Sequence, residues 1–150
     1  MDSDQRQREL TEKLSKTGCR LTPQRAMVIK ILAHSHTHPS VEEIYQLVRA
    51  EFPMTSLGTI YKTVELLNEM GEILELGFAH HSSRYDGKNP IPHPHLICLK
   101  CETIVDPDLN MLDNLATVLS ERTGYQIVQH RLDFYGICPD CLSKQAERVE

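Results

Sequence analysis

The sequence lacks any long apolar run: nowhere do about 18 apolar residues follow one another, as a membrane-spanning helix would need. Its first residues, MDSDQRQREL, contain no apolar stretch of the kind found in secretory signal peptides. Low-complexity tracts are also absent, which argues against disorder. With 40% hydrophobic and 25% charged residues among 150, we expect one domain or two small ones in the cytoplasm, with no membrane partner.

Basic residues are also fewer than acidic ones, 16 against 21. The net charge of −5 argues, at face value, against nucleic acid as a partner. Acidic residues are nevertheless absent between Glu12 and Glu42. Five basic residues lie in that gap: Lys13, Lys16, Arg20, Arg25 and Lys30. This distribution fits a basic face on an acidic protein and, equally well, an ordinary solvated helix surface.

The first 35 residues predict two helices. Leu10 and Leu14 mark a short amphipathic helix that ends at Gly18. Thr22 and Pro23 then have the pattern of an N-cap and a first helical position. The apolar stripe of this second helix is expected at Ala26, Ile29 and Ala33.

Two further helices and a hairpin are expected next. Ser40 and Glu43 have capping-box spacing and open a helix that stops before Pro53. Its inward residues are expected to be Ile44, Leu47 and Val48. Ser56 caps a helix that runs to Gly71, with Ile60, Val64 and Leu67 inward and Tyr61, Lys62 and Glu65 outward.

Helix, short turn and helix form the pattern of a helix-turn-helix, although two packed helices of a small bundle give it too. Residues 72–78 and 83–86 are strand-like stretches around His80, His81 and Ser82. This hairpin, or wing, favours a winged helix.

A hinge is predicted at about 87–92, where glycine and prolines resist both helix and strand. The N-terminal domain would then span residues 1–88 and the C-terminal domain residues 93–150. In the latter, strands are expected at 95–100, 103–105 and 125–137, and a helix at 110–123. The second half therefore mixes helix and strand.

Two Cys-x-x-Cys pairs, Cys98 with Cys101 and Cys138 with Cys141, indicate a metal site. Each short turn brings two sulfurs to one side, and two such pairs make a four-cysteine zinc site. The alternative is a redox dithiol, because Cys138-Pro139-Asp140-Cys141 alone resembles a thioredoxin-type motif. The second pair favours structural zinc, and Cys19 is expected to be a small buried residue.

The eight histidines suggest a second metal. His93 and His95 lie two apart, so on a strand both imidazoles point the same way and can reach one ion. An isolated histidine, by contrast, is more often a surface residue or a hydrogen-bonded core residue.

Six separated motifs together resemble the ferric uptake regulator (Fur) superfamily. They are Thr22-Pro23-Gln24-Arg25, His38-Pro39-Ser40, Thr59-Ile60-Tyr61, Ser83-Arg84-Tyr85-Asp86, His93-x-His95-Leu96-Ile97-Cys98-x-x-Cys101 and the terminal Cys-x-x-Cys. The resemblance covers essentially the whole chain. It implies an α+β protein with an N-terminal winged helix-turn-helix domain that binds double-stranded operator DNA. Its C-terminal α/β domain would hold the four-cysteine zinc site and form a homodimer.

The resemblance also implies a regulatory metal site of three imidazoles and two carboxylates: His38, Asp86, His93, His95 and Asp106. These donors suit Fe(II) or Mn(II). Because His38 and Asp106 come from different domains, one ion there would fix the angle between the domains. It would thereby set the spacing of the two recognition helices of a dimer.

Asp86 and Asp106 indicate the peroxide-regulator branch of the superfamily, since iron-uptake regulators resembling this sequence tend to have glutamate at both positions. The branch implies that bound Fe(II) reacts with hydrogen peroxide, that His38 or His93 is oxidised, and that the operator of peroxide-defence genes is released. Mn(II) would support DNA binding without this sensitivity.

For DNA, the resemblance places Tyr61 and Lys62 on the recognition helix, with Tyr61 against thymine methyls and Lys62 against a phosphate or base edge. Arg20 matches a residue that enters an A·T-rich minor groove. Arg25 and Lys16 are candidates for phosphate contacts, and surface solubility is a simple alternative for Lys16.

A further ligand site of many iron regulators is incomplete in this sequence. Pro92 and Pro94, which cannot ligate, stand where those regulators have a histidine and an aspartate. Asp113 and His130 match the other two positions. We therefore expect this half-site to be solvated.

Three other functions fit parts of the pattern. An iron or zinc uptake regulator would share the fold and most ligands. A non-haem iron enzyme could use the same histidines and aspartates, but the sequence has no evident substrate-pocket signature and the helix-turn-helix would go unexplained. A redox protein would have a reactive, zinc-free Cys138 or Cys141.

Overall fold

The computed structural model describes residues 2–78, 81–107 and 114–148. The chain divides into two compact units, Met1–Ile91 (unit 1) and Pro92–Glu150 (unit 2). Within the described residues, every helix is too short or too polar to span a lipid bilayer.

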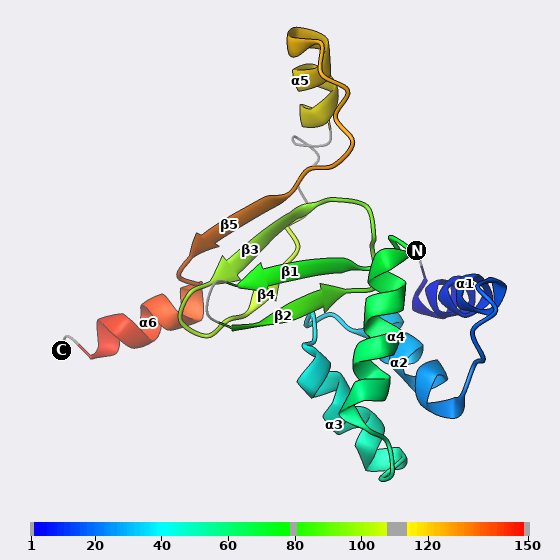
Figure 1. Ribbon diagram of the computed structural model, residues 1–150. Coiled ribbons are helices and arrows are strands. Elements are labelled where there is room, and N and C mark those ends of the chain that lie inside the picture. The colour runs from blue at the N-terminus through cyan, green and yellow to red at the C-terminus, as the bar shows by residue number, and fades with distance from the viewer. Residues whose placement is uncertain (1, 79–80, 108–113, 149–150) are drawn as a thin grey trace. The chain divides into compact units, whose positions relative to one another are not determined.

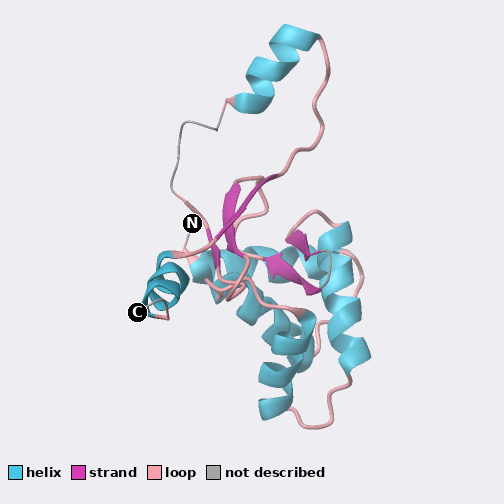
Figure 2. Ribbon diagram, turned by 90° about the vertical axis from the view of Figure 1, so that its left-hand side faces the viewer, coloured by secondary structure: helices cyan, strands magenta, loops and turns pink. Residues whose placement is uncertain are grey.

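In its described part, unit 1 consists of four helices followed by a β-hairpin (Figure 1). The helices are α1 (Ser3–Lys16), α2 (Pro23–His34), α3 (Val41–Glu51) and α4 (Leu57–Glu69). Three predicted N-caps are confirmed, because the side chains of Thr22, Ser40 and Ser56 each accept a hydrogen bond from the backbone N–H three residues on. These bonds satisfy donors that a helix start otherwise leaves open. The short turn between α3 and α4 can be followed in Figure 2.

The apolar faces of the four helices form the core of unit 1. Its buried helical residues are Leu10, Leu14, Val28, Ile29, Leu32, Ala33, Val41, Ile44, Val48, Ile60, Val64 and Leu67. The apolar stripe predicted for α2 omitted Val28 and Leu32, which are buried, and included Ala26, which is only partly buried. The buried face is wider than predicted because α2 packs against α1, α3 and α4. Leu47 was predicted to face inward and is 51% exposed.

The hairpin consists of β1 (Leu74–Phe78) and β2 (His81–Asp86), which pair antiparallel. The sequence predicted a turn around His80 to Ser82. That prediction was wrong for His81 and Ser82, which belong to β2, while His80 lies outside the described residues. The backbone N–H of Tyr85 donates to the carbonyl oxygen of Pro39 at 3.0 Å. This bond joins β2 to the loop between α2 and α3.

Unit 2 contains a small mixed sheet with the order β4-β3-β5. Its strands are β3 (Pro94–Cys98), β4 (Ile104–Val105) and β5 (Leu132–Gly136). The central strand β3 pairs antiparallel with β4 and parallel with β5. Ile97 and Ile104 are buried, whereas Leu96, Val105 and Phe134 are about half exposed.

Two helices complete the described part of unit 2: α5 (Leu115–Thr123) and α6 (Pro139–Glu147). Residues 110–113 of the predicted 110–123 helix lie outside the described residues. The long strand predicted over 125–137 was wrong for 125–131, because only Leu132–Gly136 aligns with β3. Helix α6 was missed, although Pro139 at its first position and Asp140 in its first turn are typical helix-start signals.

Candidate metal centres and nucleic-acid interface

The four paired cysteines lie where β3 and β5 end in unit 2. Cys98 is the last residue of β3, and Cys101 follows in a turn closed by the Glu102 N–H donating to the Cys98 carbonyl oxygen at 3.0 Å. Cys138 stands at the N-cap position of α6 without a side-chain capping bond, and Cys141 lies in the first turn of that helix. Parallel pairing of β3 with β5 therefore brings the two Cys-x-x-Cys turns together.

The sulfur geometry fits one tetrahedral ion. All four sulfurs lie within 4.8 Å of one another, and the Cys101 and Cys138 sulfurs are 3.7 Å apart. A tetrahedral zinc site with Zn–S bonds of about 2.3 Å has sulfurs about 3.8 Å apart. The backbone N–H of Cys138 also lies 3.3 Å from the Cys98 sulfur, as a donor to a thiolate would. The cluster thus has the ligand chemistry of a structural zinc site.

The environments of the thiols also favour a bound cation. Backbone N–H groups, that of Cys101 foremost, lower the pKa of Cys98 to about 6. The Thr103 hydroxyl, 3.1 Å from the Cys101 sulfur, lowers the pKa of Cys101. Cys138 and the other nearby sulfurs raise the pKa of Cys141 to about 12. Crowded thiolates repel one another, so full deprotonation needs a neutralising cation.

In unit 1, His38 and Asp86 form a buried pair. His38 Nε2 lies 3.3 Å from Asp86 Oδ2, and the two side chains are only 5% and 4% exposed. The other carboxylate oxygen of Asp86 accepts hydrogen bonds from the N–H groups of Lys88 and Asn89 at 3.0 and 3.2 Å. One oxygen is thus fixed by the following turn while the other faces the imidazole.

The backbone around His38 is held by the hairpin. His38 has a φ of 54°, in the left-handed region that a residue with a side chain rarely occupies. The guanidinium of Arg84, on β2, donates to the backbone carbonyl oxygens of Thr37 and His38. Both contacts lie within unit 1 and position the His38 imidazole beside Asp86.

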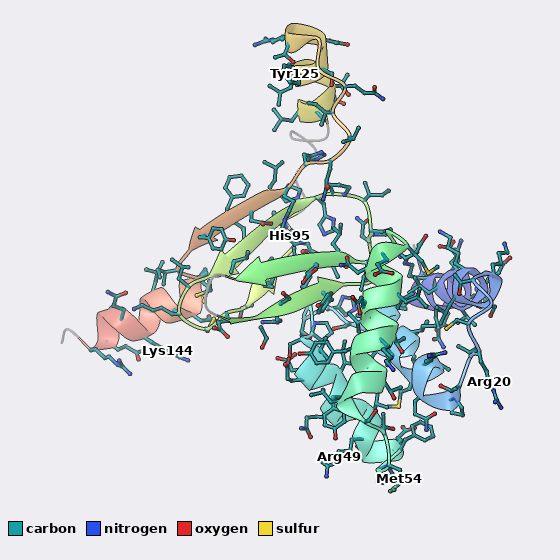
Figure 3. The ribbon with its side chains drawn as sticks, in the orientation of Figure 1. Arg20, Arg49, Met54, His95, Tyr125 and Lys144 are labelled. Atoms are coloured by element: carbon teal, nitrogen blue, oxygen red, sulfur yellow. The ribbon has the colours of Figure 1, made fainter. Side chains whose placement is uncertain are left out.

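Unit 2 brings together His93, His95 and Asp106. Nε2 of His93 lies 3.4 Å from one Asp106 oxygen, and Nε2 of His95 lies 3.5 Å from the other. The two imidazole centroids are 4.4 Å apart. His95 is buried on β3, where Figure 3 labels it, and Asp106 directly follows β4. This set of nitrogen and oxygen donors fits a divalent ion such as Fe(II) or Mn(II).

Helix α4 carries two of the residues predicted to contact DNA. Tyr61 and Lys62 are both exposed on α4. The Tyr61 hydroxyl donates to Glu42 at 3.1 Å, and this bond raises the pKa of Tyr61. Met54, in the turn before α4, is 96% exposed and projects from the tip in Figure 3. The sequence predicted a short turn here but did not single out Met54.

The other predicted DNA contacts differ in their surroundings. Arg20 is exposed and points outward from the loop between α1 and α2 (Figure 3). Arg25 donates to the Arg20 carbonyl oxygen at 2.8 Å and lies 3.0 Å from the sulfur of Cys19, which is only partly buried. Lys16 forms an exposed ion pair with Glu12 at 3.1 Å, which favours the solubility interpretation.

Several residues around these sites were not singled out by the sequence. Asp133 contacts His95 and was missed because the strand register was unknown. Arg84 was seen only as part of a motif. Of the incomplete further site, His130 is exposed, and Asp113 lies outside the described residues.

Comparisons with known proteins agree on one family. Residues 16–135 match the sequence profile of the Ferric uptake regulator family. The peroxide-responsive repressor PerR of Staphylococcus aureus (strain USA300) is 39% identical over 134 residues, covering 87% of this chain and 88% of that protein. The Campylobacter jejuni peroxide stress regulator has a TM-score of 0.70 at 29% identity, covering 89% of this chain and 97% of its own. A zinc-bound manganese uptake regulator has a TM-score of 0.67 at 33% sequence identity, and the match covers 86% of this chain and 98% of its own.

Proposed function

Because the chain belongs to the ferric uptake regulator family, we propose that it is a metal-dependent transcriptional repressor, and not an enzyme, that senses hydrogen peroxide. It binds operator DNA of peroxide-defence genes as a homodimer in the cytoplasm. Oxidation of a ligand histidine releases that DNA.

In this proposal, the regulatory ion would be held by residues of both units. Unit 1 contributes the buried His38–Asp86 pair, and unit 2 contributes His93, His95 and Asp106. An ion bound by both groups couples the angle between the units to metal occupancy. Loss of one imidazole weakens this coupling, and the recognition helices of the dimer lose the spacing that the operator requires.

Two short carboxylates carry the proposal of peroxide sensing. Asp86 and Asp106 each lie against a ligand imidazole within their own unit, and the 39% identical relative is named a peroxide-responsive repressor. An Fe(II) ion held by these residues would supply the chemistry that activates hydrogen peroxide, one oxygen of which would be added to an imidazole while the other would leave as water. The His38 and His93 side chains are only 5% and 16% exposed, so each imidazole would be shielded from bulk solvent during such an oxidation.

DNA binding rests on α4 and the basic residues before it. Tyr61 and Lys62 lie on the exposed face of α4, and Arg20 is exposed ahead of α2. Dimerisation is supported by the half-exposed apolar side chains Leu96, Val105 and Phe134, which line one face of the unit 2 sheet. A second copy would cover this face.

The test is a DNA-binding assay with Fe(II)- and Mn(II)-loaded protein, each with and without hydrogen peroxide. Peroxide should release DNA only from the Fe(II) form, and mass spectrometry should find one added oxygen on His38 or His93. His38→Ala should abolish metal-dependent DNA binding and leave zinc in place. His36→Ala, in the same loop, is the matched control. Peroxide-insensitive DNA binding by the Fe(II) form would refute the proposal.

A metal-uptake regulator is the second candidate, because the zinc-bound manganese uptake regulator is 33% identical. It predicts DNA binding that follows metal concentration, with no effect of peroxide and no oxidised histidine. The same assay therefore separates the two functions.

A further inference from the structure

His95 is the most deeply buried of the residues proposed to hold the regulatory ion, at 2% exposure. It lies on β3, in register with Asp133 on the neighbouring parallel strand β5. Residues paired in this way project from the same face of a sheet. Asp133 therefore lies on the face that carries the His95 imidazole, within one unit.

The two ring nitrogens of His95 face different carboxylates. Nε2 lies 3.5 Å from Asp106, on the side of the ligand group, whereas Nδ1 lies 3.3 Å from Oδ1 of Asp133. Among the described residues, this buried Oδ1 accepts no formed hydrogen bond. A small rotation of the ring would bring the contact into the range of about 2.7–3.2 Å typical of N–H···O bonds.

Asp133 is itself held in place. Its second oxygen accepts a hydrogen bond from Arg131 at 2.9 Å, and its side chain is 13% exposed. Arg131 thereby places its positive charge beside the carboxylate. An ionised carboxylate only accepts hydrogen bonds, so it selects a donor on the facing ring nitrogen.

We propose that Asp133 is a positioning residue that keeps the proton of His95 on Nδ1 and so leaves the Nε2 lone pair for the metal ion. A neutral imidazole carries one N–H, and the partner of one nitrogen decides which nitrogen ligates. Metal-bound histidines commonly use a carboxylate in this way, and it strengthens them as ligands. The inference rests on the proposed regulatory site.

The first test needs no regulatory metal. Nitrogen NMR of histidine-labelled protein, with zinc retained and the regulatory ion removed, reports which nitrogen of His95 is protonated; a His95→Asn spectrum assigns the signal. The wild type should show the Nδ1–H form. Asp133→Ala should shift the population towards Nε2–H, whereas Asp133→Asn should keep Nδ1–H because its amide oxygen still accepts. Glu121→Gln, an exposed acid on α5, is the charge-matched control.

The second test is Mn(II) affinity of the same variants, with zinc content as the check of folding. Asp133→Ala should weaken Mn(II) binding about 10- to 100-fold, and Asp133→Asn less. An unchanged tautomer in Asp133→Ala would overturn the inference. So would equal loss of affinity in both variants with Nδ1–H retained, since Asp133 would then be a direct ligand. A wild type that binds no Mn(II) would instead refute the regulatory site, and the tautomer spectra would still decide the role of Asp133.

Discussion

The guanidinium of Arg84 donates a hydrogen bond to the backbone carbonyl oxygen of His38, 46 residues away in the sequence. This contact joins the second strand of the hairpin to the loop that carries a proposed metal ligand. The positive φ of His38 costs about 1–3 kcal/mol, which the hairpin contacts offset. The position of this imidazole thus depends on a residue outside the proposed ligand set.

Arg84→Ala should weaken Mn(II) binding about tenfold, because the loop that holds His38 relaxes. Isothermal titration of zinc-loaded protein measures this affinity. Arg122→Ala is the control: this arginine lies on α5 of unit 2, away from the loop that holds His38 in the sequence, and its loss should leave the Mn(II) affinity unchanged. Wild-type affinity in Arg84→Ala would show that the loop holds its conformation without the guanidinium.

Gly87→Ala should destabilise unit 1 by about 1–3 kcal/mol through overpacking. A Cβ at this position would lie 2.6 Å from Cβ and 3.0 Å from the carbonyl oxygen of Leu32, in α2. Gly77→Ala in β1 is the control, because a Cβ there meets nothing within 4 Å. Thermal unfolding should show a lower midpoint for Gly87→Ala alone. Equal midpoints would mean that α2 can shift to make room.

The same glycine shows what the sequence could and could not predict. Gly87 was interpreted as part of a turn-rich hinge, whereas the structure shows it packed against Leu32 and accepting a hydrogen bond from Arg6 at 2.9 Å. Arg6 is 2% exposed and also contacts Glu72. A buried arginine in a polar first helix leaves no periodic signal, so only tertiary contacts reveal it.

Local signals predicted local structure well. Thr22, Ser40 and Ser56 cap helices as expected because capping depends on residues three apart. The strand predicted over 125–137 was mostly wrong because its length depends on a partner strand far away in the sequence. Asp133 was missed for the same reason: its relation to His95 exists only through strand register.

Cys141→Ser should remove the zinc and destabilise the small sheet of unit 2, because the four sulfurs and the β3–β5 pairing together bring its two Cys-x-x-Cys turns close to each other. Elemental analysis should find no zinc, and size-exclusion chromatography should show loss of the dimer. Cys19→Ser is the control, because Cys19 lies in unit 1 and contacts Arg25. Full zinc content in Cys141→Ser would contradict the four-sulfur site.

Lys62→Ala should weaken operator binding and lower the slope of log affinity against log salt concentration by about one for each Lys62 that contacts a phosphate. Filter binding over a range of salt concentrations measures both. Lys144→Ala is the matched control, since Lys144 is an exposed lysine on α6 of unit 2 (Figure 3). A slope unchanged in Lys62→Ala would show that Lys62 contacts no phosphate.

Asp106→Glu should make the Fe(II) form less sensitive to peroxide while it still binds DNA. Asp106 lies 3.4 Å from His93 and 3.5 Å from His95, and the longer glutamate keeps the charge but shifts both imidazoles relative to the ion. Peroxide titration followed by a gel shift measures the release of operator DNA. The Mn(II) form is the internal control, because its DNA binding should be equally resistant in both proteins. If peroxide released operator DNA equally from the two Fe(II) forms, the aspartates would no longer favour peroxide sensing over metal-uptake regulation.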